Sequence, residues 1–81
     1  MEKETRLAII GIIVSDGECA HKVNAVLHDF APIIIGRMGI PYHKKNVNVI
    51  SVAVDGEVEK INALTGKLGQ ISGVSSKALW R

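Results

Sequence analysis

The chain has 81 residues, a formal net charge of +2 and a hydrophobic fraction of 47%. This length supports one domain, which we expect over residues 1–81. The small charge, without a dense basic stripe, argues against direct DNA binding. The lone Cys19 excludes an internal disulfide and a cysteine-rich metal site. The apolar run at residues 7–14 is too short to span a membrane, and no secretion signal is recognisable, so we expect a cytoplasmic location.

The first half of the chain predicts a strand, a helix and a second strand. Residues 5–14 are rich in β-branched side chains and are apolar at both parities, which is typical of a strand covered on both faces. Residues 18–31 repeat apolar side chains at helical spacing, and Pro32 ends that helix. A second strand is expected over residues 33–40.

The second half predicts a strand over residues 47–54, a helix over 57–68 and a last strand over 74–80. Gly69 is expected to cap the C-terminus of the second helix. Gly66, inside that helix, is expected to permit close packing on a sheet, because glycine in a helix otherwise costs about 1 kcal/mol relative to alanine.

The predicted order, β-α-β-β-α-β, indicates an α+β protein of ferredoxin-like type. Such a fold has one four-stranded antiparallel sheet with both helices on one face. No helix remains to cover the other face, although the first and third strands are apolar at both parities. We therefore expect a second copy of the chain to cover it, which predicts a homo-oligomer, either a dimer or a tetramer.

The connection over residues 36–46 contains more polar and charged side chains than a hairpin turn requires. Arg37 could pair bidentately with a carboxylate or phosphate, and the nearby Gly39 could allow a ligand to approach closely. Tyr42 could cover such a ligand or pack on a partner subunit. The alternative is that Arg37 only keeps an edge strand soluble.

Asp16 and Gly17 lie where the first strand is predicted to give way to the first helix. Backbone N–H groups at a helix start can hold an anion, and Gly17 would let it approach. The alternative is that Ser15 or Asp16 only caps the helix. Together with the hairpin residues, they complete the predicted small-ligand site, which consists of Asp16, Gly17, Arg37, Gly39 and Tyr42.

Neither a metal site nor a catalytic centre is predicted. His21 and His28 stand seven residues apart, about 10.5 Å along a helix, which is too far for one ion to bridge. His43 alone cannot hold a metal, and the sequence leaves open whether it joins a site between subunits. The chain has no phosphate-binding loop, dinucleotide fingerprint or paired carboxylates. We expect no enzyme activity and no cofactor.

Several segments resemble known regulatory proteins. The Asp16-Gly17 pair before Val23-Asn24-Ala25-Val26-Leu27, and the turn at residues 68–74, resemble ACT-like regulatory domains. Ile35-Gly36-Arg37-Met38-Gly39-Ile40-Pro41-Tyr42 and Ala63-Leu64-Thr65-Gly66-Lys67-Leu68-Gly69 resemble the iron-only hydrogenase system regulators, which are small stand-alone ACT-like proteins. The resemblance implies a βαββαβ module that oligomerises, binds small ligands at interfaces and acts near hydrogenase and its maturation system.

That family is also similar in fold to the C-terminal domain of nickel-responsive regulators. Their nickel site is not expected here, because residues 47–54 contain no histidine and Cys19 lies in the other predicted helix. The few residues before the first strand cannot supply their DNA-reading element. The sequence thus predicts an oligomeric regulator or sensor of a hydrogenase system that binds a small ligand. The alternative is an adaptor that senses nothing and docks onto a hydrogenase-related or DNA-binding protein.

Overall fold

The computed structural model describes residues 4–15 and 19–81. Two short 3₁₀ segments, η2 (Ala31–Ile33) and η3 (His43–Lys45), flank the second strand. The helices and strands are β1 (Arg6–Val14), α1 (Ala20–Asp29), β2 (Ile34–Tyr42), β3 (Val47–Gly56), α2 (Val58–Gly69) and β4 (Val74–Trp80). The predicted order of elements is therefore confirmed.

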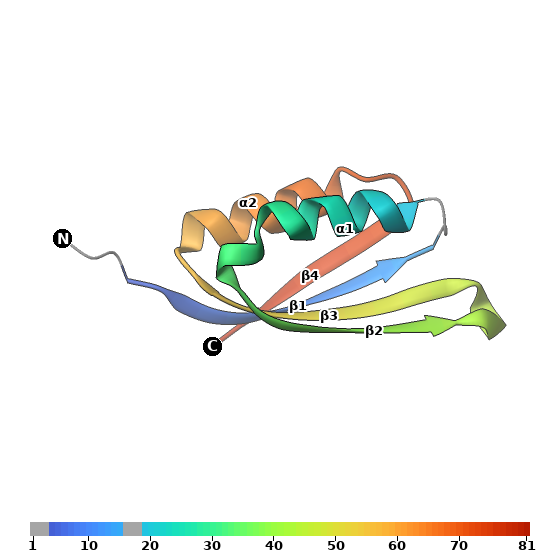
Figure 1. The fold of residues 1–81 in the computed structure, drawn as a ribbon, viewed down its shortest axis with the longest axis horizontal. Coiled ribbons are helices and arrows are strands. Elements are labelled where there is room, and N and C mark those ends of the chain that lie inside the picture. Colours follow the sequence, from blue (N-terminus) through green and yellow to red (C-terminus); the bar gives the residue numbers. More distant parts are fainter. Residues whose placement is uncertain (1–3, 16–18) are drawn as a thin grey trace.

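The four strands form one antiparallel sheet in the order β2-β3-β1-β4, with β2 and β4 at its edges. Both helices lie over the same face of this sheet, as Figure 1 shows. This is the predicted ferredoxin-like, ACT-like architecture. β1 begins and β4 ends at the same end of the sheet as the start of α2, while the β2–β3 hairpin extends to the opposite end (Figure 1).

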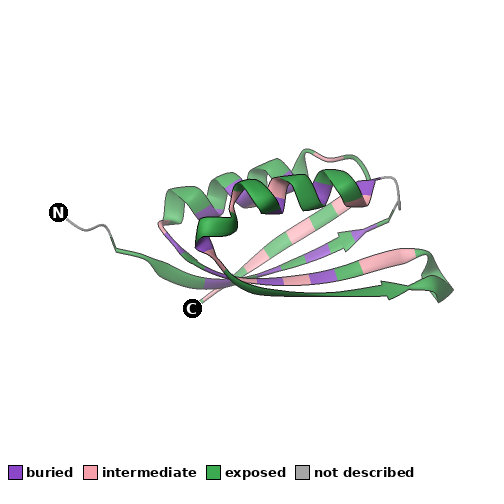
Figure 2. Cartoon of the chain, viewed as in Figure 1, coloured by how far each residue is buried: buried purple, intermediate pink, exposed green. Residues whose placement is uncertain are grey.

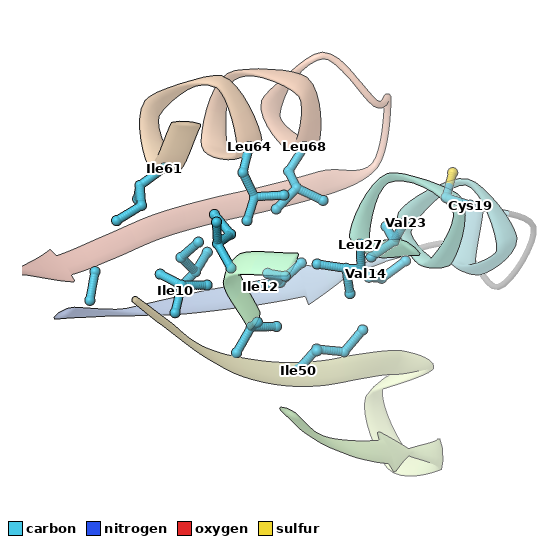
Figure 3. Packing of buried hydrophobic residues seen from close by; sticks show 14 residues of the cluster. Ile10, Ile12, Val14, Cys19, Val23, Leu27, Ile50, Ile61, Leu64 and Leu68 are labelled. Atoms are coloured by element: carbon cyan, nitrogen blue, oxygen red, sulfur yellow. The ribbon is translucent and has the colours of Figure 1, made fainter. Parts of the chain in front are cut away.

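The core lies between the sheet and the two helices (Figure 3). Alternate residues of β1 point into it, so Ile10, Ile12 and Val14 are almost fully buried while their neighbours are exposed. Helix α2 contributes Ile61, Leu64 and Leu68, and α1 contributes Val23 and Leu27. The spacing of three or four between these helix residues gives each helix one apolar stripe facing the sheet.

No helix covers the opposite face of the sheet (Figure 2), and the side chains exposed there are largely apolar. Among the described residues, ten large apolar side chains are exposed, and strand alternation places all but Val58 on this face. We call it the open face; its large apolar residues are Leu7, Ile9, Ile13, Ile35, Met38, Ile40, Tyr42, Val49 and Leu79. A patch of this extent usually marks an interaction surface.

The ends of the helices differ from the prediction. Helix α1 begins at Ala20, and its N-cap residue, Cys19, makes no side-chain capping hydrogen bond. Its buried thiol instead donates to the Ser72 carbonyl oxygen at 2.9 Å, and the Ser15 N–H donates to the Gly73 carbonyl at 2.7 Å. The first bond joins the start of α1 to the turn before β4, and the second joins the end of β1 to the same turn.

Two glycine predictions for α2 are wrong. Helix α2 runs through Gly69 and is capped by Gln70 in a right-handed conformation, while the left-handed glycine is Gly73, with a φ of 83°. A Cβ added to the exposed Gly66 would meet nothing within 4 Å, so Gly66 does not serve close packing on the sheet. The close approach occurs at Gly56 instead, where an added Cβ would lie 2.9 Å from Ile33 Cγ2.

The polar connection between the second and third predicted strands proves to be mostly strand. Strand β2 continues through Tyr42, and the turn is confined to residues 43–46. Asn46 makes that turn with a φ of 54°, in the left-handed region. Gly36 and Gly39 therefore lie within β2 and do not form the turn.

Gly56→Ala and Gly66→Ala should change stability in opposite directions. At Gly56 the added methyl must displace a β-branched side chain in the core, which we expect to cost about 1–3 kcal/mol. At Gly66 alanine removes backbone freedom from the unfolded chain and should stabilise by up to about 1 kcal/mol. Urea unfolding of both variants against wild type measures this, and equal effects would contradict the packing described at Ile33.

Candidate functional site

The predicted ligand-site residues are separated in the structure. Asp16 and Gly17 lie outside the described residues. Arg37, Gly39 and Tyr42 all belong to β2, the edge strand. Successive side chains of a strand point to opposite faces, so these residues do not all serve one surface.

Arg37 lies on the helix side of the sheet. It is paired with Val52, whose side chain is buried beneath the helices. The Arg37 guanidinium donates through Nη2 to Asn24 Oδ1 on α1 at 2.7 Å. Both groups are exposed, and the bond joins the edge strand to the first helix.

A groove of about 410 Å³ lies between α1 and β2 beside this pair. Its polar groups come from Asn24, His28 and Arg37, and its apolar part comes from Leu27, Ala31 and Ile34. An exposed guanidinium can hold a carboxylate or phosphate bidentately, and the adjacent apolar wall can receive the rest of a small molecule. Arg37, Asn24 and His28 are thus the best candidates for a ligand site within one chain.

Sequence reasoning missed Asn24 and His28 as members of this site. They are exposed members of α1, and they reach Arg37 only because α1 packs beside the start of β2. Their spacing of four puts them on one side of the helix, a signal that is visible in the sequence. That signal does not say which strand the helix side will face.

Tyr42 lies elsewhere. Its register with Val47 places it on the open face, and five residues of strand, roughly 17 Å, separate it from Arg37. Gly39 is two residues after Arg37 and so faces the same side of the sheet. A Cβ added to Gly39 would lie 3.9 Å from Ile50 Cγ1, which is an ordinary contact distance. Gly39 therefore provides no close approach that requires glycine, and one chain does not bring Tyr42 to Arg37.

Metal-binding residues do not gather in the described part of the chain: it contains no group of three or more His, Cys, Asp or Glu side chains able to hold an ion. His21, His28 and His43 are all exposed. Within the same residues, neither helix has the length and apolar character needed to cross a membrane.

The architecture and the open face define a small ACT-like module, and the comparisons with known proteins specify the family. A family model described as "Iron-only hydrogenase system regulator, putative" and called TM1266-like matches residues 6–78. The chain is 41% identical to an uncharacterized protein, TM1266, from Thermotoga maritima; the match covers 95% of this chain and 98% of that one, with a TM-score of 0.90. The chain belongs to the TM1266-like family.

A more distant structure confirms the fold alone. A formyltetrahydrofolate deformylase from Pseudomonas putida KT2440 aligns with a TM-score of 0.65 at 9% identity, and the match covers 90% of this chain and 28% of that enzyme. No curated protein matches the chain. The predicted family is thus confirmed, and the family description supports a regulatory role.

The bond between Arg37 and Asn24 should contribute little to folding. It is exposed, and surface substitutions usually change stability by no more than about 0.5 kcal/mol. We expect the free energies of unfolding in urea of Arg37→Ala, Arg37→Lys and Asn24→Ala each to lie within about 1 kcal/mol of the wild-type value. A loss of several kcal/mol in the free energy of unfolding would show that the bond is needed for folding. Arg37 would then not be free to leave Asn24 and bind a ligand.

Proposed function

We propose that the chain is a self-associating regulatory protein of a hydrogenase system that binds a small anionic ligand beside Arg37. The regulatory role follows the family description. The observation that carries the ligand proposal is the exposed Arg37 guanidinium beside a groove with an apolar wall. The ligand class is a molecule with a carboxylate or phosphate and a small apolar portion, because a guanidinium recognises the former and the groove accommodates the latter.

Binding near a subunit contact is part of this proposal. β2 is an edge strand, and from Gly36 onward its residues are exposed. A second copy that covered the open face would bring further side chains to this edge. The remaining predicted site residues could then contribute from either subunit; they are Asp16, Gly17, Gly39 and Tyr42. Within one chain, Tyr42 and Arg37 lie on opposite faces of the sheet.

A second candidate function is an adaptor without a ligand, and the open face favours it. Nine large exposed apolar side chains on one surface could receive a hydrogenase-related or DNA-binding protein in place of a second copy. Contact with DNA would then pass through that protein, in keeping with the chain's own small positive charge. Binding of a protein partner without any small-ligand response would favour this alternative.

A thermal-shift screen with amino acids, nucleotides and divalent metals tests the ligand proposal. We expect an anionic compound to raise the melting temperature of wild type. Arg37→Lys retains the charge but loses the planar fork, so it should weaken binding, and Arg37→Ala should cost on the order of 1.5–3 kcal/mol of binding free energy. Lys22→Ala is the matched control, because it removes an exposed cation of α1 that does not line the groove. A ligand bound equally by all four proteins would refute a site at Arg37.

Self-association is tested separately. We expect sedimentation of the purified chain at micromolar concentration to show a species larger than the 8.7 kDa monomer, since an apolar sheet face is stabilised by burial. Ile13→Asp places a charge in the open face and should shift the protein toward monomer while its circular dichroism stays folded. A wild-type protein that sediments only as monomer would contradict the proposed assembly.

A further inference from the structure

The side chains that line the groove beside Arg37 offer many hydrogen-bond donors and few acceptors. A guanidinium has five N–H donors, and the bond from Arg37 to Asn24 uses one of them. That bond occupies Asn24 Oδ1, so the two N–H donors of the Asn24 amide are left for another partner. The imidazole of His28, in its neutral form, adds one donor and one acceptor. The groove is therefore suited to a ligand rich in acceptor oxygens.

The backbone carbonyls around the groove already accept hydrogen bonds. Where α1 ends, the Phe30 N–H donates to the carbonyl oxygens of Leu27 and His28. In η2, the Ile34 N–H donates to the carbonyl oxygen of Ala31. An ammonium group bound beside Arg37 would thus meet carbonyls that each have a partner, and the other groups in reach are mainly donors.

Arg37 is the one permanently charged residue among the described residues that line the groove. Asp29 is the nearest acidic residue along α1, but one helical step turns it about 100° from His28, and it does not line the groove. Lys22 and His21 are also exposed on α1 and also lie outside the lining. No other residue of β2 is charged. A single positive charge without a neighbouring carboxylate matches a ligand with one negative charge.

We infer that this groove binds a 2-oxo acid with one carboxylate and a short aliphatic chain, and that it rejects the corresponding amino acid. This inference rests on the proposed ligand site at Arg37 and specifies its chemistry. The carboxylate accepts from Arg37, and the adjacent oxo oxygen accepts from the Asn24 amide. The aliphatic chain lies on the apolar wall of Leu27, Ala31 and Ile34, in a groove of about 410 Å³.

The ammonium group is what excludes the amino acid. It replaces the oxo oxygen, so it would direct N–H donors at the Asn24 amide donors. With the carboxylate held bidentately, the ammonium nitrogen would lie about 5–6 Å from the guanidinium carbon of Arg37. Like charges at that distance repel even in water, and more strongly at a protein surface. We expect the oxo acid to bind about tenfold or more tightly than the amino acid.

Charge also separates this ligand from other anions. A phosphate monoester carries about −1.5 to −2 at neutral pH, which exceeds the single positive charge of the groove. A dicarboxylate such as 2-oxoglutarate would place its second carboxylate against the apolar wall, where loss of water is unfavourable. Both should therefore bind more weakly than a monocarboxylate with an aliphatic chain.

Isothermal titration of the full-length chain with three compounds of one carbon skeleton tests the inference. These compounds are 4-methyl-2-oxopentanoate, leucine and 4-methylpentanoate, which carry an oxo group, an ammonium group and neither. We expect the oxo acid to bind most tightly to wild type and Arg37→Ala to lose this binding. Asn24→Ala should remove the advantage of the oxo acid over 4-methylpentanoate, because that advantage depends on the amide donor.

A carboxylate placed in the groove should reduce the discrimination. His28→Glu gives an ammonium group a partner, so the ratio of the oxo-acid affinity to the leucine affinity should fall about tenfold. His21→Glu is the matched control: it makes the same change one to two turns earlier on α1, outside the groove lining, and should leave the ratio within about twofold of wild type. Both histidines are exposed, and circular dichroism checks that the variants remain folded.

The results that overturn the inference differ from those that overturn the proposed site. Leucine bound as tightly as the oxo acid contradicts the inference, and it would show that a carboxylate from Asp16 or from a second subunit receives the ammonium. Equal effects of the two glutamate substitutions also contradict it. Inorganic phosphate bound in place of the oxo acid, and lost in Arg37→Ala, overturns the inference but supports an anion site at Arg37. Failure of all these anions to bind wild type removes that site as well.

Discussion

The structure depends on a sheet that is apolar on both faces in a chain with only two helices. Burial of apolar area is the main stabilising term in folding, and a domain of this size buries only about 60% of its unfolded surface. The helices cover one face and create the whole core, with Ile10, Ile12 and Val14 at its centre. Ile9 and Ile13, from the same strand, remain about half exposed, at 48% each. An exposed apolar face of this extent usually marks an interaction surface.

This constraint explains what the sequence could and could not predict. Periodicity located all six elements, because a period of two or of 3.6 is fixed by backbone geometry alone. The apolar residues at both parities of β1 also predicted the open face, because one layer of helices covers only one side of a sheet. The ends of the elements were less predictable. Gly69 was expected to cap α2, but the helix runs through Gly69 and Gln70 is its cap residue. The chain turns into β4 at Gly73, whose carbonyl accepts a hydrogen bond from the Ser15 N–H.

The candidate site was predicted least well, for a physical reason. Arg37, Gly39 and Tyr42 are close in sequence, and the glycines and proline around them suggested a loop whose side chains could converge. They lie instead in an extended strand, where alternation sends Arg37 and Tyr42 to opposite faces. The true neighbours of Arg37, Asn24 and His28, are on α1, and only packing of the helix against the sheet brings them together. Contacts of this kind are not encoded in local spacing.

The separation of Arg37 from Tyr42 also connects the site with assembly. Tyr42 lies on the open face near the Lys44-Lys45 tip, so a second copy that covers this face would bury it, whereas Arg37 stays on the helix side. The same edge strand would then contact a partner subunit on one face and a ligand on the other. A ligand that orders β2 from the helix side would necessarily alter the strand that the partner contacts, and coupling of this kind is reciprocal. If both proposals hold, one edge strand in a chain of 81 residues would link ligand binding to subunit assembly.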